Sequence, residues 1–98
     1  MSHTIIYTLC SNGCGFDAEC DGRHIGEITF VRIAGNKLLI DHTGVEPEFR
    51  NNEIGLNLLR HVVNFARVHN WRVVTICPFA RAMFNRYHEF DDVRLLNK

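Results

Sequence analysis

The chain has 98 residues, of which 46% are hydrophobic, with seven Phe and only two Pro. This composition is typical of a compact globule and excludes a disordered chain, and the length predicts one domain over residues 1–98. Eleven basic and eleven acidic residues give a formal net charge of zero, which removes the electrostatic basis for binding nucleic acid or a membrane surface.

No stretch of the sequence approaches the roughly 20 apolar residues that a transmembrane helix needs. The apolar run over residues 4–9 is too short for a signal peptide and has no basic flank. The four cysteines, Cys10, Cys14, Cys20 and Cys77, are too unevenly spaced for a balanced disulfide framework. We therefore expect reduced thiols and a cytoplasmic protein.

The first half of the chain predicts an antiparallel meander. Residues 3–9 and 15–20 are short β-rich segments with a turn signal between them. Residues 25–33 form a longer β-rich run whose two faces are both apolar, as expected of an interior strand. A Gly-Asn turn then predicts a hairpin onto a strand over residues 37–45.

In the second half, the apolar spacing changes to that of a helix over residues 52–69. Residues 71–76 predict a short strand, and residues 79–87 predict a second helix. The strand, helix and strand within residues 38–76 make a crossover long enough to set two strands parallel. A final turn is expected to be anchored by Phe90, Val93 and Leu95.

The most informative segment is the polar loop at residues 49–56, which leads from the predicted fourth strand into the first helix. The first N–H groups of a helix have no partners inside it, so such a loop can bind an anion. The loop also carries a carboxylate, Glu53, which would repel a phosphate. Alternatively, a glutamate in the first turn stabilises the helix by about 0.3 to 1 kcal/mol through the helix dipole.

Four short motifs occur in the order of one known family. They are Ile40-Asp41-His42-Thr43, the loop from Arg50 to Gly55, Cys77-Pro78-Phe79, and the closing run from Tyr87 to Asp92. Together they make residues 27–94 resemble the minimal YjdJ-type branch of the GNAT superfamily of acetyl-CoA-dependent N-acetyltransferases. Several motifs in the right order are far more specific than any one of them alone.

The resemblance implies an α/β fold of the α+β type, with a mixed, mostly antiparallel sheet, two main helices and a V-shaped opening between the strands ending near Val45 and Cys77. Acetyl-CoA would be the co-substrate and would lie in this opening. Its pantetheine arm would hydrogen-bond along the backbone of Thr43, Gly44 and Val45, as an added strand does. The other implied cofactor-binding residues are Arg50, Asn51, Asn52, Glu53, Ile54, Gly55, Cys77, Phe79 and Phe84.

The loop departs from the family pattern, which is Arg or Gln, two variable residues, Gly, one variable residue, then Gly or Ala. Arg50 and Gly55 match, but Glu53 replaces the first glycine, and Asn51 replaces another that is usual in this branch. At about 5 Å, a carboxylate beside a phosphate costs roughly 1 to 3 kcal/mol, or up to roughly a hundredfold in affinity. Two hypotheses follow: an N-acetyltransferase, and a catalytically silent interaction module whose anion site is occupied by Glu53.

The implied reaction is direct attack of an amine on the thioester carbonyl, which needs a proton acceptor and an acid for the departing thiolate. Cys77 could protonate the thiolate, accept the acetyl group, or be a buried structural cysteine. His42 could relay a proton or simply hydrogen-bond to the backbone. Larger relatives carry a tyrosine acid where Phe84 stands here, which leaves Cys77, water or Tyr87 for that role.

Other candidate groups have simpler interpretations. Four zinc-ligand side chains near the N-terminus are spaced too tightly for a zinc finger or ribbon, so we expect no metal site. Arginines near the second helix could contact CoA phosphates or form a solvated face. These groups are Cys10, Cys14, Cys20 and His24, and Arg81, Arg86 and Arg94.

The acceptor is expected to be an amine, either a small molecule or a protein lysine, because the helices that shape the acceptor pocket of larger relatives have no counterpart in this sequence. His61 and His69 are expected on the surface and at the end of the first helix. Exposed edge strands in so short a domain make a homodimer plausible.

Overall fold

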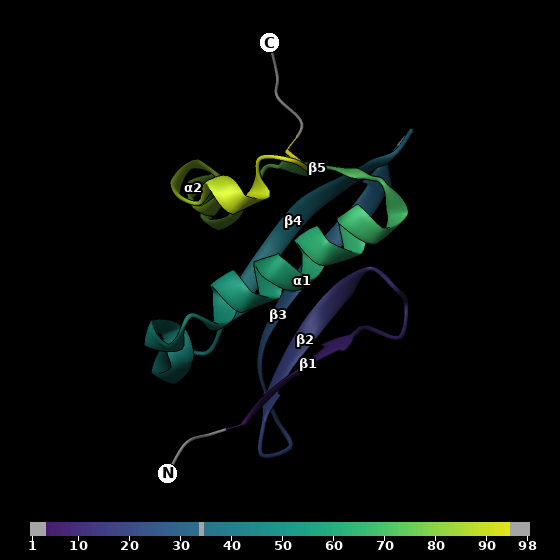
Figure 1. Cartoon of the computed structure of the whole chain (residues 1–98). Helices are drawn as coiled ribbons and strands as arrows, with labels where there is room; N and C mark the ends of the chain where they lie inside the picture. The colour runs from purple at the N-terminus through teal and green to yellow at the C-terminus, as the bar shows by residue number, and fades with distance from the viewer. Residues whose placement is uncertain (1–3, 34, 95–98) are drawn as a thin grey trace.

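The computed structural model describes residues 4–33 and 35–94, which contain one five-stranded sheet with the strands in chain order (Figure 1). Neighbouring strands from β1 to β4 pair antiparallel, and β5 pairs parallel with β4. The predicted meander and the predicted parallel crossover are therefore both confirmed. The strands are β1 (Ile5–Leu9), β2 (Gly15–Cys20), β3 (Arg23–Ile33), β4 (Lys37–Val45) and β5 (Arg72–Thr75).

Helix α1 (Ile54–His69) connects β4 to β5 and lies diagonally across the sheet (Figure 1). Its apolar residues recur at three- and four-residue intervals, so they form one stripe that is buried against the strands. Phe65 extends this contact to Phe16 on β2 and Phe30 on β3, with ring centroids 6.1 and 5.6 Å apart. The completely buried residues of the helix are Leu58, Leu59, Val62, Val63 and Ala66.

Three shorter elements complete the fold: the 3₁₀ helix η1 (Pro47–Asn52), helix α2 (Pro78–Arg86) and the 3₁₀ turn η2 (His88–Phe90). Phe84 of α2 is fully buried and packs against Phe90, with ring centroids 5.3 Å apart. Phe90 and Val93 are buried as expected of the final turn. Two residues of the predicted elements, His3 and Leu95, lie outside the described residues.

Several element boundaries differ from the predictions by one or two residues. Helix α1 begins at Ile54 rather than Asn52, because the chain is a 3₁₀ helix up to Asn52 and Glu53 then adopts a left-handed conformation. Helix α2 begins one residue early, at Pro78, whose missing N–H is compatible with a first helical turn. Strand β5 covers only the middle of the predicted residues 71–76.

The sheet is packed on one face and open on part of the other. Leu38 and Ile40 of β4 are completely buried on the packed face. On the opposite face Val31 and Ile33 of β3 are 43% and 37% exposed, and Ile76 after β5 is 56% exposed. The interior position predicted for β3 is confirmed, but its second apolar face is accessible to solvent.

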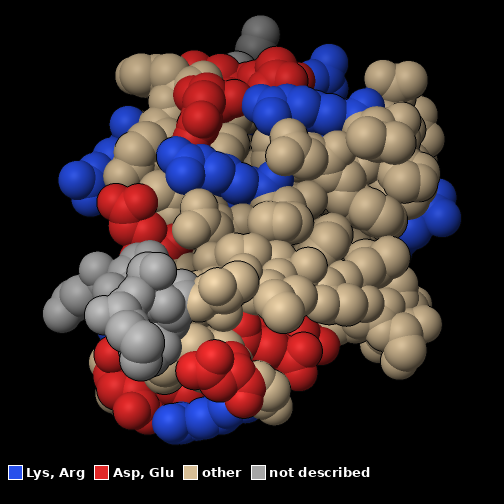
Figure 2. All heavy atoms as spheres, turned by 60° about the horizontal axis from the view of Figure 1, so that its bottom comes forward, with Lys and Arg blue, Asp and Glu red and all other residues tan. Residues whose placement is uncertain are grey.

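Charged side chains are mixed rather than grouped by sign. Figure 2 shows Lys and Arg beside Asp and Glu at several places, with uncharged residues forming most of this face. Two of the ion pairs join distant parts of the chain, Arg23 with Glu48 at 2.5 Å and Arg60 with Glu89 at 3.1 Å. None of the helices in the described residues is long and apolar enough to cross a membrane.

Candidate active site

The sheet opens between β4 and β5. Their pairing runs from Lys37 opposite Arg72 only as far as Ile40 opposite Thr75, and β4 then continues to Val45 while the chain after β5 enters α2. A cavity of about 300 Å³ lies at this opening, between the end of β4 and the first turns of α1 and α2. All six lining residues were implied cofactor-binding residues: Thr43, Gly44, Val45, Arg50, Gly55 and Phe79.

A second cavity, of about 250 Å³, adjoins the first and shares Arg50, Gly55 and Phe79 with it. Glu53 and the cationic Arg86 also line this second cavity. Because Arg50 and Arg86 line the same space as Glu53, the carboxylate is opposed by two positive charges. The residues that the sequence had not indicated here are Leu56 and Met83, while Tyr87 completes the lining.

Glu53 is the N-cap residue of α1 and has a left-handed backbone, with φ 58° and ψ 23°. Its exposed side chain makes no capping hydrogen bond, and its carbonyl accepts the first helical bond from Asn57 N–H at 3.0 Å. The amides of Ile54, Gly55 and Leu56 therefore have no acceptor within the helix. The start of α1 thus has no side-chain cap, and Glu53 precedes the first turn instead of lying within it.

Gly55 is required by a close approach between the two helices. A Cβ atom there would lie 2.8 Å from Cζ of Phe79, which is shorter than any ordinary carbon contact. The neighbouring Ile54 side chain is buried in the core, so only its backbone can face the cavity. Asn51 and Asn52 belong to the 3₁₀ helix that leads into this turn.

Arg50 closes one end of the opening. Its Nε donates a hydrogen bond of 3.3 Å to the carbonyl of Val45, the last residue of β4. The Val45 carbonyl, which the resemblance assigned to the pantetheine arm, therefore already accepts a hydrogen bond from the exposed Arg50. A ligand lying along β4 would have to share or displace this bond.

Cys77 lies at the closed end of the opening, where it is the N-cap residue of α2. It is 8% exposed, and its Sγ donates to Oγ1 of Thr43 across the gap at 3.6 Å. The thiol is therefore behind Thr43, which itself lines the cavity. Phe84, also implied as a cofactor residue, is completely buried against Phe90 and lines neither cavity at the opening.

A β-bulge in β4 places His42 on the opposite side of the sheet from Thr43. Thr29 pairs with His42, but Phe30 pairs with Ile40, so Asp41 is an extra residue in β4. Leu38 and Ile40 point into the core, whereas His42 is exposed instead of following that alternation. Adjacent residues of a regular strand face opposite sides, and the bulge determines which side each takes: it turns His42 away from the core face and places Thr43 on it.

A second bulge adds Ile25 to β3, because Ala18 pairs with Gly26 but Glu19 pairs with His24. His24 and Glu27 are three residues apart, which would place them on opposite faces of a regular strand. Here they share one face, with His24 Nε2 at 3.3 Å from Oε1 of Glu27. The bulge therefore brings a second histidine to the side of the sheet that carries His42.

These side chains form an imidazole–carboxylate network of Asp17, His24, Glu27 and His42, drawn from β2, β3 and β4. His24 Nε2 lies 3.3 Å from Oδ1 of Asp17, and His42 Nε2 lies 3.0 Å from Oε2 of Glu27. His42 was a candidate from the sequence, with a backbone hydrogen bond as the alternative, but its observed partner is a carboxylate. Glu27 was missed.

The match to protein families decides what kind of protein has this geometry. Residues 15–93 match the family model described as GCN5-related N-acetyl-transferase. The chain belongs to the GNAT family. The resemblance found in the sequence is confirmed at this level, and membership of the YjdJ-type branch stays a prediction. No curated protein matches the chain.

Solved structures of GNAT proteins share this fold. The chain is 30% identical to a GCN5-like candidate N-acetyltransferase from Staphylococcus aureus, with a TM-score of 0.76, covering 95% of this chain and 90% of that one. A GNAT acetyltransferase from Brucella melitensis in complex with acetyl-CoA is 22% identical, with a TM-score of 0.61 and coverage of 70% and 50%. N-acetylglutamate synthase from Neisseria gonorrhoeae, complexed with coenzyme A and N-acetyl-glutamate, is 20% identical, with a TM-score of 0.66 and coverage of 76% and 18%.

In this GNAT chain the four residues considered as zinc ligands bond to several different partners. Cys10 Sγ and His24 both contact Asp17, while Cys14 bonds to the carbonyl of Asn12 and Cys20 to its neighbour Asp21. Burial, with the Asp17 carboxylate as the second cause, raises the pKa of the Cys10 thiol. The described residues contain no group of side chains arranged to hold a metal ion.

The histidines of α1 lie where the sequence placed them. His61 stacks on Tyr7 with ring centroids 4.7 Å apart, and His69, the last residue of the helix, stacks on Trp71 at 4.4 Å. Of the arginines considered for CoA, Arg86 lines the second cavity, whereas Arg94 donates to Asn85 at 2.7 Å.

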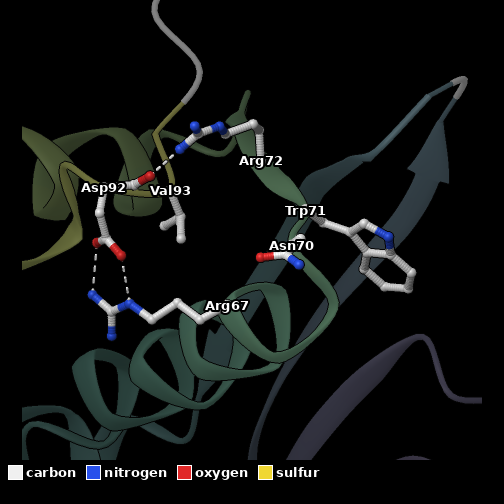
Figure 3. A pocket seen from close by; sticks show the side chains of 6 residues that line it. All are labelled: Arg67, Asn70, Trp71, Arg72, Asp92 and Val93. Atoms are coloured by element: carbon white, nitrogen blue, oxygen red, sulfur yellow. Dashed lines mark hydrogen bonds and ion pairs between the residues drawn. The ribbon is translucent and has the colours of Figure 1, made fainter.

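A further cavity, of about 450 Å³, lies at the other end of α1 and is shown in Figure 3. Its charged side chains, Arg67, Arg72 and Asp92, already have partners within the lining. The Arg67 guanidinium holds both oxygens of Asp92 at 2.8 Å and also donates to the carbonyl of Glu89 at 2.6 Å. Arg72 donates to the carbonyl of Asp92. This arrangement fastens the segment after α2 to α1 and β5.

Removing the Arg67–Asp92 contact should cost stability in a pH-dependent way. The hydrogen bond from Arg67 lowers the pKa of Asp92, so the pair stabilises the fold above the ordinary aspartate pKa of about 3.9 and stops doing so as the pH falls through the lowered value. Because both side chains are more than a third exposed, solvent screening limits the loss in Arg67→Met to about 1 kcal/mol at neutral pH.

Urea unfolding of Arg67→Met and wild type, at neutral pH and near pH 2.5, measures this contribution. The charge-dependent part of the difference should shrink as the pH falls toward 2.5, and Asp92→Asn should show the same trend. An equal difference at both pH values would assign the role of Arg67 to its neutral hydrogen bonds with Glu89 and Asn64.

Proposed function

We propose that this GNAT protein binds acetyl-CoA and transfers the acetyl group to an amine by direct attack on the thioester. The observation that carries the proposal is the opening between β4 and β5, where Thr43, Gly55 and Arg50 line one cavity beside the uncapped start of α1. The cradle supplies free amides, a cation and an unpaired strand edge, which are the groups that recognise a pyrophosphate and an amide-containing arm.

In this proposal the pantetheine arm lies along residues 43–45 and the pyrophosphate lies on the amides of residues 51–55 and the start of α1. Arg50 and Arg86 add positive charge on either side of Glu53. Phe79 provides an apolar wall and holds the close approach of α2 to Gly55. Acetyl-CoA would supply the activated acetyl group.

Cys77 is proposed to protonate the departing thiolate. Its thiol donates to the hydroxyl of Thr43, which lines the cavity, so a proton can pass through that hydroxyl to the space in which the C–S bond would break. The proposal favours this role over an acetyl-cysteine intermediate because the thiol is 8% exposed and lies behind Thr43. The departing CoA thiolate needs only a proton from Cys77, whereas an acetyl-cysteine intermediate would need an exposed Cys77 thiol.

Isothermal titration of the protein with acetyl-CoA tests the binding part of the proposal. We expect a measurable heat and a rise in melting temperature at millimolar cofactor. Absence of both would favour the silent interaction module, in which the Glu53 carboxylate replaces the phosphate. The exposed position of Glu53, without a capping hydrogen bond, supports the binding hypothesis.

Replacing Cys77 with alanine should lower turnover at least about tenfold, because proton transfer by a positioned group contributes that much or more. The affinity for CoA should change little, because the thiol does not line the cavity. Steady-state kinetics and calorimetry on the same variant separate the two effects. Cys77→Ser, which keeps a donor, is the matched control and should retain more activity. An unchanged rate in Cys77→Ala would remove the thiol from the chemistry.

The amine acceptor is proposed to be a small molecule or a protein lysine that approaches an open site in the cytoplasm. The four cysteines, all of which are free thiols, are compatible with a reducing compartment. The homodimer stays a prediction; its basis is the edge strand β1, on which Ile6 and Leu9 are 57% and 43% exposed.

A further inference from the structure

The imidazole–carboxylate network lies on the side of the sheet that α1 does not cover. Its four members are aligned across three strands only because Ile25 and Asp41 are bulged. β-Bulges often re-aim a side chain beside an active site. The bulge at Ile25 brings His24, and the bulge at Asp41 brings His42, to the face that carries Glu27, so both bulges place an imidazole beside the same carboxylate.

Glu27 is the centre of the network. Its Oε2 is hydrogen-bonded to Nε2 of His42 at 3.0 Å, and its Oε1 lies 3.3 Å from Nε2 of His24, within ion-pair distance. A Cβ atom on Gly44 would lie 2.3 Å from Oε2 of Glu27 and 3.1 Å from Nε2 of His42. The hydrogen bond between Glu27 and His42 is therefore seated against the backbone of Gly44, and Gly44 is also a wall of the cavity at the opening.

We propose that Glu27 is a positioning residue that holds His42 ready to take a proton from the acceptor amine, which reaches the opening from the uncovered side of the sheet. The inference rests on the proposed function. The opening passes between β4 and β5, with Thr43 toward the cofactor cavity and His42 on the other side. The cofactor and the acceptor would thus meet from opposite sides of the sheet.

With Nε2–H donating to the Glu27 carboxylate, the lone pair of His42 is on Nδ1, which has no hydrogen-bond partner among residues 4–33 and 35–94. Nδ1 takes one proton from the ammonium, and the freed nitrogen lone pair attacks the thioester carbonyl. The C–N bond forms, the C–S bond breaks, Cys77 gives its proton to the CoA thiolate, and the second nitrogen proton restores the Cys77 thiol. His42 returns its proton to water.

The charged groups around His42 suit an ammonium. From β2 comes Asp17, from β3 come Glu27 and His24, and from β4 itself comes Asp41, whose carboxylate accepts from Thr29 at 2.7 Å. Three carboxylates and one further imidazole therefore surround the site, and no Lys or Arg in the described residues pairs with any of them. This arrangement attracts a cation and disfavours an anionic acceptor.

Rates of acetyl transfer to Nα-acetyl-lysine amide, measured from neutral pH to about pH 10.5, test the inference, since a lysine amine loses its proton by itself near pH 10.4. Glu27→Gln should lower kcat/KM about tenfold at neutral pH with the KM for acetyl-CoA unchanged. The deficit should shrink as the pH rises, because a neutral amine no longer needs the base. Glu48→Gln, the same change at an exposed carboxylate paired with Arg23, is the matched control.

If Glu27 acts through His42, the double variant Glu27→Gln/His42→Gln should be no slower than His42→Gln alone. A deficit that persists equally at high pH, or effects that simply add, would overturn the positioning role. Nitrogen NMR of the His42 ring gives a readout that needs no acceptor: the Nε2–H tautomer is expected in the wild type, and the Nδ1–H tautomer would contradict the proposal. Loss of CoA binding in calorimetry would instead count against the proposed function.

Discussion

Replacing Glu53 with glycine should raise the affinity for CoA by up to about a hundredfold. The substitution removes a negative charge that lines the cavity with Arg50 and Arg86, and it removes the Cβ atom beside the uncapped amides. It should also stabilise the fold by about 1 kcal/mol, because a left-handed backbone at φ 58° is strained for glutamate and unstrained for glycine.

Titration calorimetry and thermal unfolding of two variants separate these causes. Glu53→Gln removes the charge but keeps the Cβ atom and the left-handed backbone, so it should gain affinity and leave the melting temperature near that of the wild type. Glu53→Gly should gain both. If neither variant binds CoA more tightly than the wild type, the carboxylate does not oppose the phosphate, and the family departure at Glu53 is neutral for binding.

Adding a single methyl group at Gly55 should weaken both the fold and the cofactor site. The new Cβ atom would lie 2.8 Å from Cζ of Phe79, so the ring must move into the cavity it lines or α2 must move outward. Overpacking of this kind costs roughly 1 to 3 kcal/mol, which exceeds the intrinsic helical advantage of alanine, about 0.5 to 1 kcal/mol. We expect a net loss of about 1 kcal/mol and about tenfold weaker CoA binding.

A double-mutant cycle tests whether the contact between Gly55 and Phe79 is the cause. Phe79→Leu shortens the side chain that meets the new methyl group, so Gly55→Ala should cost much less stability in that background. Urea unfolding measures the four members of the cycle. Additive effects would mean that Gly55→Ala acts elsewhere, for example on the backbone of the first helical turn.

The order of the elements could be predicted because the spacing of apolar residues is regular in both the meander and the first helix. Alternation ends at Val45, and the three-and-four spacing from Ile54 to His69 is unbroken, so the meander and the crossover follow from pattern alone. The predicted start of α1 was two residues too early, because the spacing of apolar residues gives no indication of the left-handed backbone at Glu53. A glutamate in that conformation is uncommon, and sequence pattern gives no signal for it.

The residues that line the cavity at the opening could be named from the sequence, because short motifs carry them and each motif lies at the end of an element. The residues proposed for the acceptor side could not. Regular alternation puts His24 and Glu27 on opposite faces and puts His42 in the core with Ile40, and both expectations fail at bulged residues. Bulges depend on how two strands pair, which no local pattern reports. Phe84 was misassigned to the cofactor for a related reason, since helical spacing does not distinguish a core ring from a pocket wall.

The crossover has a consequence for how this protein assembles. One wall of the opening is the end of β4 at Val45, and β4 belongs to the meander, whose strand contacts are local. The other wall consists of β5 and α2, which follow α1 in the chain. We therefore expect β5 to pair with β4 only after α1 has packed on the sheet. Parallel pairing over just four residues, from Lys37 opposite Arg72 to Ile40 opposite Thr75, is a small anchor for that late-joining half. We therefore expect the opening between β4 and β5 to be the last feature to form and the first to open in a partial unfolding event, so that a molecule with an intact meander can still lack the proposed cofactor site.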